Sequence, residues 1–289
     1  MNLETKRWLI DKEDKELSIT EQCKVLGLYK SSLYYKRAPK YSEEDLKILN
    51  RMDEIFTEYP YYGYKRLHNQ LLREGFDIGK DRVLKYMHVL GLEALYPKKK
   101  RGLSAPNKEH KIYPYLLKDI EIKRPNHVWA IDITYIRMKG GFVYLVALID
   151  WYSRYLLSHR VSNSLELNFC KEALYEALWL YEKPEIFNSD QGSQFTSNEF
   201  TKILIDNGIK ISMDSKGRAI DNIIIERFFR TIKYENIYIN EYKRVKEVKG
   251  GIRKYIKQYN CKRLHQSLEY NTPHEIYAGL KELSINGCS

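Results

Sequence analysis

The sequence predicts an α/β core, with a mixed five-stranded sheet and flanking helices, that follows small all-α helix-turn-helix modules. Two changes of pattern along the chain lead to this prediction. Apolar residues recur at helical spacing through residue 92, whereas β-branched and aromatic runs dominate from residue 124. Between these parts lies a basic segment bounded by Pro97 and Gly102, which is typical of a linker.

The amino-terminal part predicts two small helical modules. Residues 17–37 have a helix-turn-helix pattern, in which Ser18 or Thr20 caps the first helix and Gly27 forms the corner. Residues 43–92 contain three further amphipathic stretches, two of which end at a glycine. Any small helical pair can show the first pattern, so it favours nucleic-acid binding only in combination with other features.

The second part of the chain predicts a sheet. Residues 128–136 and 142–150 are rich in β-branched and aromatic residues, and Gly140 and Gly141 form a tight turn between them. The remaining elements are a strand at 155–161, a helix at 165–181, a strand at 185–189, a helix from Thr196 or Ser197 to 207, a strand at 210–213 and a helix containing Glu226. This order of elements is typical of a ribonuclease H-like α/β core.

The composition argues against several classes of protein. Hydrophobic residues make up 43% of the chain and charged residues 30%, as in ordinary globular proteins. No apolar run approaches the roughly 18 residues that cross a bilayer, and the first residues contain no apolar signal segment. The four cysteines are scattered without a Cys-x-x-Cys pair, which indicates unpaired thiols rather than a disulfide framework or a thiolate zinc site. We therefore expect a cytoplasmic protein with no membrane partner.

The charge favours a polyanionic partner. The formal net charge is +11, but it is unevenly distributed along the chain. Residues 121–215 carry 10 Lys and Arg against 12 Asp and Glu, whereas residues 1–120 carry 24 against 18 and residues 216–289 carry 15 against 8. An acidic middle between basic flanks suits an enzyme that gathers carboxylates for metal ions and holds DNA with its outer parts. A generally basic surface without a partner is the alternative.

Three carboxylates fall where such a sheet would bring them together. Asp132 lies within an apolar strand, where an unpaired charge is costly to bury, and Asp190 directly follows another strand. Glu226 lies early in a helix that Asp221 and Asn222 open. Phosphoryl transfer with two metal ions needs a few hard oxygen ligands close together, and carboxylates suit magnesium or manganese. A structural role is the alternative at each position, but it would have to hold at all three, so we interpret the three as catalytic metal ligands.

The helix around Glu226 also places cations beside the proposed ligands. Glu226, Arg230 and Lys233 fall at i, i+4 and i+7 and therefore share one helical face. The two cations could hold a DNA phosphate next to the carboxylate. An ordinary ion pair between Glu226 and Arg230 is the alternative, and without the other two carboxylates it would be the better interpretation.

These residues carry a resemblance to a known family. Thirty-five residues separate Asp190 from Glu226, and Lys233 follows Glu226 by seven, a spacing similar to that of insertion-sequence transposases in the retroviral integrase (DDE) superfamily. The resemblance is closest to the orfB-type product, which is the second reading frame of two-frame insertion sequences. It covers almost the whole chain through residues 62–68, 129–134, 188–195, 216–222, 226–233, 259–260, 263–268 and 272–273.

The resemblance implies a Mg²⁺-dependent DNA transposase, a polynucleotidyl transferase in which Mn²⁺ can substitute. It implies that Asp132, Asp190 and Glu226 hold the metal while water nicks DNA at an element end and the freed 3′-hydroxyl then attacks another phosphodiester. No covalent protein–DNA intermediate is expected. Retroviral integrases also carry a His-His-Cys-Cys zinc module, and because this chain lacks that spacing we expect no zinc.

The resemblance also implies partners and DNA contacts. The expected partners are double-stranded DNA, comprising the terminal inverted repeats and the target, further copies of this chain in the DNA complex, and the upstream-frame protein of the same element. The protein would be bacterial and associated with the nucleoid when bound to DNA. The residues expected to contact DNA are Lys233, Arg230, Arg227, Gln194, Lys98, Lys99, Lys100 and Arg101.

The sequence thus predicts five regions. They are a helix-turn-helix-like segment at 1–40, a helical DNA-binding module at 41–97, a basic linker at 98–123, a catalytic core at 124–245 and a basic helical region at 246–289. Two other functions remain compatible with this layout. A ribonuclease H-like nuclease would use the same carboxylates without joining strands, and a non-catalytic DNA-binding regulator would retain the fold but has no need of an intact set of three carboxylates.

Overall fold

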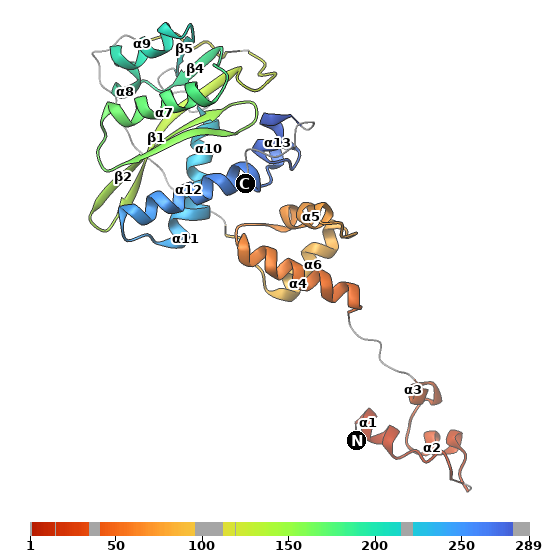
Figure 1. Cartoon of the computed structure of the whole chain (residues 1–289). Coiled ribbons are helices and arrows are strands. Elements are labelled where there is room, and N and C mark those ends of the chain that lie inside the picture. The colour runs from red at the N-terminus through yellow and green to blue at the C-terminus, as the bar shows by residue number, and fades with distance from the viewer. Residues whose placement is uncertain are drawn as a thin grey trace. The chain divides into compact units, whose positions relative to one another are not determined.

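The computed structural model describes residues 2–14, 16–34, 41–95, 112–118, 120–214 and 222–279. The chain forms two compact units, Met1–Arg51 and Met52–Ser289, which are described separately (Figure 1). Within the described ranges no helix is both long enough and apolar enough to cross a membrane.

The first unit contains the predicted helix-turn-helix. Its helices are α1 (Leu3–Trp8), α2 (Ile19–Val25), α3 (Lys30–Tyr34) and the start of α4 (Glu43–Glu58). Ser18 caps α2, because its hydroxyl accepts the N–H of Glu21 while the Glu21 carboxylate accepts the N–H of Ser18. Gly27 has a φ of +61° at the corner, a conformation that a side chain would disfavour. The cap is therefore Ser18 rather than Thr20, and residues 35–37 of the expected second helix lie outside the described part.

The three-helix module predicted at 43–92 is also present. Its helices are α4, α5 (Tyr64–Arg73) and α6 (Lys80–Leu90). Leu67, Leu71 and Val83 are fully buried, as the amphipathic spacing predicted. Gly91 ends α6 in the left-handed conformation, where glycine is the favoured residue.

The second unit contains the predicted mixed sheet. Its strands are β1 (Val128–Met138), β2 (Gly141–Asp150), β3 (Leu156–Ser162), β4 (Ile186–Ser189) and β5 (Lys210–Met213), in the order β3-β2-β1-β4-β5. β2 pairs antiparallel with β1 and β3, whereas β4 pairs parallel with β1 and β5. Gly141 already pairs with Met138, so the turn from β1 to β2 lies one residue earlier than predicted. The ribonuclease H-like fold class is confirmed.

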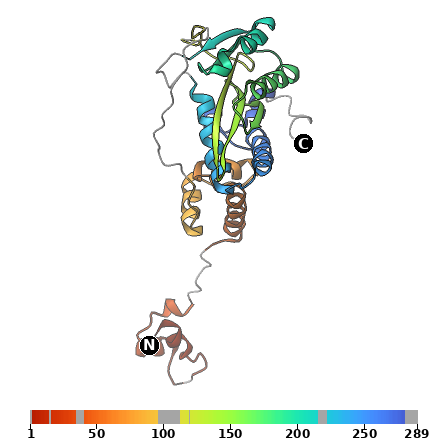
Figure 2. The same ribbon diagram turned by 90° about the vertical axis from the view of Figure 1, so that its left-hand side faces the viewer.

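Helices cover both faces of the sheet (Figures 1 and 2). One face packs against α7 (Leu167–Leu180), α8 (Ser193–Thr196) and α9 (Asn198–Asp206), and the other against α10 (Ile223–Ile232) and α12 (Val245–Cys261). Because side chains alternate along a strand, Trp129 and Ile131 of β1 enter the first core, whereas Ala130 enters the second. The side chain of Asp132 therefore belongs to the face that α10 covers.

The helix that carries Glu226 is interrupted. α10 ends at Ile232, and the chain continues as a π-helix, Lys233–Ile237, before the short α11 (Tyr238–Asn240). A π-turn adds a residue to the helical repeat and commonly marks a functional site. The three residues predicted on one α-helical face are thus divided between α10 and the π-helix.

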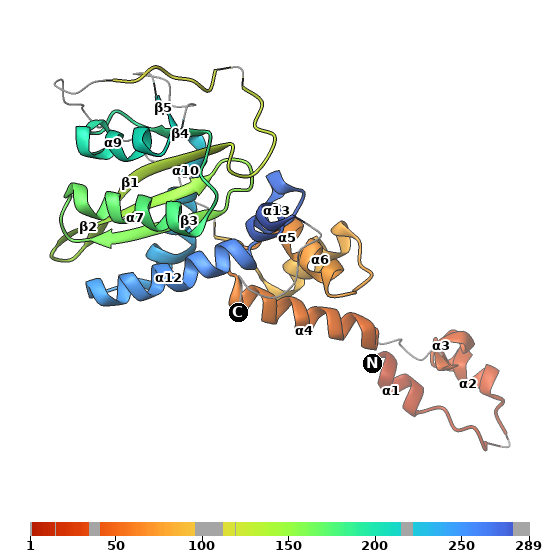
Figure 3. The ribbon, with the colours of Figure 1, turned by 45° about the horizontal axis from the view of Figure 1, so that its top comes forward.

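The carboxy-terminal region joins the sheet to the helical module. A 3-10 turn, Gln266–Leu268, follows α12 and leads to α13 (Pro273–Ala278), which lies beside α5 (Figure 3). Arg73 of α5 forms an ion pair with Glu275 of α13 at 3.0 Å.

Cys23 and Cys170 are free and buried, whereas Cys261 is disulfide-bonded, so the prediction of unpaired thiols is wrong for Cys261.

Candidate active site

Strand register places three aspartates level with one another. The parallel pairing of β1 and β4 includes Ala130 opposite Asn188, so two residues further along Asp132 stands level with Asp190. β4 and β5 pair up to Ser189 opposite Met213, and the next residues are Asp190 and Asp214. Because the carboxyl ends of parallel strands meet at one edge of a sheet, the three carboxylates gather there.

Glu226 approaches this edge from α10. Ile225 and Phe229 are buried against the sheet, whereas Glu226, between them, is exposed. The charges of Asp190, Glu226 and Asp214 all act on Asp132. The structure therefore brings the three predicted carboxylates, together with Asp214, into one electrostatic neighbourhood.

The environment disfavours the ionised form of these carboxylates. Burial raises the pKa of Asp132 well above its ordinary value, and repulsion by Asp190 raises it further, against the hydrogen bond from the N–H of Ile133 at 2.7 Å. Partial loss of solvent around the carboxyl group also raises the pKa of Asp190 and that of Glu226, although both residues remain exposed at the surface. A bound cation would relieve both effects, because it neutralises adjacent negative charge.

The loop after Asp190 holds that side chain closely. The N–H of Gly192 donates to Asp190 Oδ1 at 2.9 Å. A Cβ atom at position 192 would lie 2.9 Å from the same oxygen, which is closer than real Cβ contacts allow. Gly192 is therefore needed for the close approach of the carboxylate to the backbone.

The chemistry of these residues fits a divalent cation with oxygen ligands. Carboxylate oxygens are the ligands that magnesium and manganese prefer. In the parts of the chain that the structure describes, no three His, Cys, Asp or Glu side chains converge closely enough to form a complete metal cage. The carboxylates are thus near enough to repel one another but are held by separate elements.

Lys233 lies against the sheet. Its ammonium donates to Thr134 Oγ1 on β1 at 2.7 Å and lies 5.1 Å from the ring centre of Tyr135. Burial lowers the pKa of Lys233, and the charge of Asp132 opposes that shift. The structure therefore places Lys233 beside the carboxylates.

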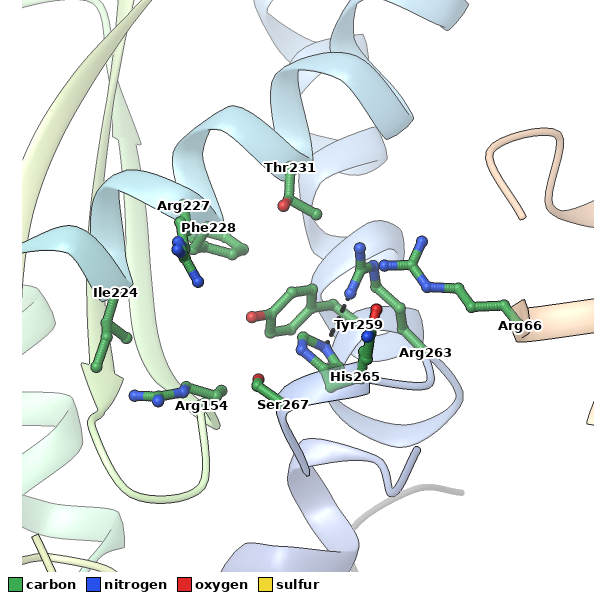
Figure 4. Close-up of a pocket in the computed structure, with 11 residues that line it drawn as sticks. Arg66, Arg154, Ile224, Arg227, Phe228, Thr231, Tyr259, Arg263, His265 and Ser267 are labelled. Carbon is green, nitrogen blue, oxygen red and sulfur yellow. Dashed lines mark hydrogen bonds between the residues drawn. The ribbon is translucent and has the colours of Figure 1, made fainter. Parts of the chain in front are cut away.

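The other expected DNA contacts are dispersed. Arg230 is exposed on α10, and the side-chain amide of Gln194 donates to the carbonyl of Leu165 at 3.4 Å. Arg227 lines a separate pocket on α10 (Figure 4). Lys98, Lys99, Lys100 and Arg101 lie outside the described residues.

Two neighbours of the carboxylates were not predicted. Asp214 directly follows β5, as Asp190 follows β4, and its Oδ1 accepts the side-chain amide of Asn188 at 2.8 Å. An acidic residue at the end of a strand was the signal that could have identified it. Thr134 lies two residues after Asp132 and thus on the same face of β1, a spacing that sequence alone could also have indicated.

Family models match both the helical part and the sheet-containing part of the chain. Two models described as integrase core domain match residues 122–219 and 207–273, and one described as HTH-like domain matches residues 43–100. Among solved structures, the HTLV-2 integrase catalytic core domain in complex with magnesium is similar, with 23% identity, 53% of this chain and 97% of that chain covered, and a TM-score of 0.44.

Curated relatives are similar over nearly their full length. The putative transposase InsK of insertion sequence element IS150 from Escherichia coli is 32% identical over 89% of this chain and 92% of the relative. The transposase of insertion sequence element IS629 from Shigella sonnei is 28% identical over 92% of this chain and 94% of the relative. The chain therefore belongs to the insertion-sequence transposases with an integrase core domain, a family of DNA polynucleotidyl transferases.

Proposed function

We propose that this transposase cleaves DNA strands at the ends of its element and joins the resulting 3′-hydroxyl to target DNA, with Asp132, Asp190 and Glu226 as its catalytic metal ligands. The observation that supports this proposal is that the three carboxylates lie at one end of the sheet, where burial and then the charges of Asp190 and Glu226 raise the pKa of Asp132. Hard oxygen ligands that repel one another form a site for Mg²⁺, with Mn²⁺ as its substitute.

The chain's own residues have distinct roles in this proposal. When bound, the metal would stabilise the attacking and leaving oxygens of the phosphodiester. Lys233, held by Thr134 next to Asp132, keeps a positive charge beside the carboxylates. Arg230 is exposed on the helix of Glu226 and is placed to contact a neighbouring phosphate.

The proposed partners follow from the division of the chain. Membership of this family implies that the chain binds DNA. We propose that the helical module at 41–97 and the basic regions at 98–123 and 246–289 hold terminal inverted repeats and target DNA around the core at 124–245. Further copies of the chain would complete the DNA complex, and the upstream-frame protein of the element would assist recognition of its ends.

The decisive test is Asp190→Asn. An amide keeps the size of the side chain but loses the charge that binds the metal, so strand cleavage should fall by at least about a hundredfold. DNA binding should remain near that of the unaltered protein. The measurement uses labelled duplexes from the two ends of the element with Mg²⁺, and Asn198→Asp, an exposed change on α9, serves as a control.

The same assay separates the proposal from its rivals. Cleavage that persists in Asp190→Asn would contradict the metal assignment. Hydrolysis by the unaltered protein without any joined product would favour a nuclease over a transposase. DNA binding without cleavage under any metal would favour a regulator.

A further inference from the structure

A second site lies on another side of α10. Its pocket has a volume of about 490 Å³ (Figure 4). Glu226 and Arg227 are adjacent in the helix, and successive residues are turned by about 100°, so the carboxylate and the pocket occupy neighbouring sides of the same turn. The residues that define this arginine pocket are Arg66 of α5, Arg154 of the β2–β3 turn, Arg227 of α10, and Arg263, His265 and Ser267 after α12.

The floor of the arginine pocket is held rigidly. Arg263 has a side chain that is 6% exposed, and it donates to both oxygens of Glu235 at 2.7 and 2.6 Å. Arg66 lies 3.6 Å from the same carboxylate. The single negative charge of Glu235 therefore lies beside two guanidinium groups, so the three side chains together carry a net positive charge.

The walls of the arginine pocket add further positive charge. Arg154 donates to the carbonyl of Trp151, and the negative charge of Asp150 favours the charged form of its guanidinium group. Arg227 is exposed, and the described residues contain no hydrogen bond or ion pair with its side chain. Repulsion between Arg227 and Arg154 contributes to a lowered pKa of Arg154, whose larger cause is burial.

His265 contributes a hydrogen-bond donor rather than a charge. Burial and then Arg263, Arg66 and Arg154 lower the pKa of His265 well below its ordinary value, so the ring is neutral. Its Nε2 lies 3.2 Å from a guanidinium nitrogen of Arg263 and must accept, which leaves the ring proton on Nδ1. Buried donors at the floor and exposed groups at the rim form a cavity suited to an anion.

Phosphate is the anion that this donor set fits best. Guanidinium groups present paired N–H donors that match phosphate oxygens, and here four of them surround one cavity. The position next to the turn that carries Glu226 indicates that the phosphate belongs to a DNA strand passing around α10.

We propose that the arginine pocket binds a backbone phosphate of the bound DNA, distinct from the phosphate that reacts at Asp132, Asp190 and Glu226. The proposal rests on the proposed function, because it takes DNA as the ligand. Arg66 comes from the HTH-like domain, and the other five residues come from the part of the chain that the integrase core models match. This phosphate would therefore be bound by both parts.

The test measures the salt dependence of binding to a duplex of arbitrary sequence, in EDTA so that no metal chemistry contributes. Each lost phosphate contact should reduce the slope of log K against log salt by about 0.9. Arg227→Gln removes a rim charge from α10, and Ser267→Asp adds a repelling charge on the opposite wall. The matched controls are Arg137→Gln and Asn163→Asp, which make equal charge changes at exposed positions outside both the pocket and the regions proposed to hold DNA.

We expect both pocket variants to lower the slope by that amount, and the double variant by no more than either alone, because they act on one phosphate. The controls should keep the slope of the unaltered protein. Unchanged slopes in the pocket variants, or equal losses in the controls, would overturn the proposal.

A second arm distinguishes DNA from a small phosphate compound. Inorganic phosphate that raises the melting temperature of the unaltered protein but not of Arg227→Gln, with identical DNA slopes for both, would overturn the assignment to DNA. Because binding in EDTA does not depend on the carboxylates, these results stand apart from the Asp190→Asn cleavage test.

Discussion

At Asp132 the folded structure disfavours the ionised carboxylate that the proposed metal site needs. Burial, Asp190, Glu226 and Asp214 all raise the pKa of its carboxyl group. A carboxyl group with a raised pKa binds its proton more tightly in the folded state than in the unfolded chain. Its contribution to stability is therefore fully present below the ordinary pKa of 3.8 and is lost as the pH rises through the raised value.

Asp132→Asn should consequently stabilise the metal-free protein at mildly alkaline pH. An increase of about 1 kcal/mol in the free energy of unfolding would raise the melting temperature by roughly 2–4 °C in a chain of this size. Mg²⁺ should raise the melting temperature of the unaltered protein but not of this variant. Asp206→Asn, at an exposed position on α9, is the control. A variant no more stable than the parent would show that Asp132 is not held at an unfavourable charge.

At the scale of elements, α12 shows how neighbouring glycines can serve different purposes. Gly250 and Gly251 lie in the same helical turn, where alanine would ordinarily be favoured. A Cβ atom at Gly250 would meet nothing within 4 Å. At Gly251 it would lie 2.0 Å from the Tyr242 hydroxyl, which donates to Asn236 of the π-helix at 3.3 Å.

Gly250→Ala should therefore stabilise the protein by about 0.5–1 kcal/mol, because it restricts the unfolded chain. Gly251→Ala should instead destabilise it by roughly 1–3 kcal/mol, because the ring of Tyr242 must move. Urea unfolding measures both. In a Tyr242→Ser background the clash is absent, so Gly251→Ala should become as favourable as Gly250→Ala. A destabilisation that persists in that background would exclude Tyr242 as its cause.

At the scale of the whole second unit, Glu235 connects distant parts of the chain. It lies in the π-helix and accepts hydrogen bonds from Arg263 and, at 2.6 Å, from Tyr255 of α12. It also pairs with Arg66 of the helical module. The pair of Arg73 and Glu275 also joins the helical module to the rest of the unit, through α13, but the side chain of Arg73 is 37% exposed. The buried network should therefore matter far more to stability than the exposed pair.

Glu235→Gln should lower the free energy of unfolding by about 3–5 kcal/mol, because it leaves Arg263 buried without its counter-charge. Arg73→Gln should cost no more than about 1 kcal/mol, since water screens an exposed pair. Chemical denaturation of both variants gives the comparison. Equal losses would mean that burial does not distinguish the two pairs.

Local patterns were sufficient to predict most elements. The runs at β1 and β2, the helix ends at Gly27 and Gly91 and the cap at Ser18 all follow from the preferences of neighbouring residues. The π-helix at Lys233–Ile237 could not be predicted in this way. Lys233 bonds to Thr134, and Glu235 bonds to Arg263, so its geometry is supported by residues far away in the sequence.

The sequence by itself determined the fold class and the candidate ligands Asp132, Asp190 and Glu226, because periodicity and residue chemistry are properties of short segments. Only the tertiary structure decided that Asp214 stands level with Asp190, since strand register is set by pairing between segments. The arginine pocket likewise arises from four separate segments of the chain. No local sequence pattern predicts such a site, because its charged side chains become neighbours only when these separate segments pack together.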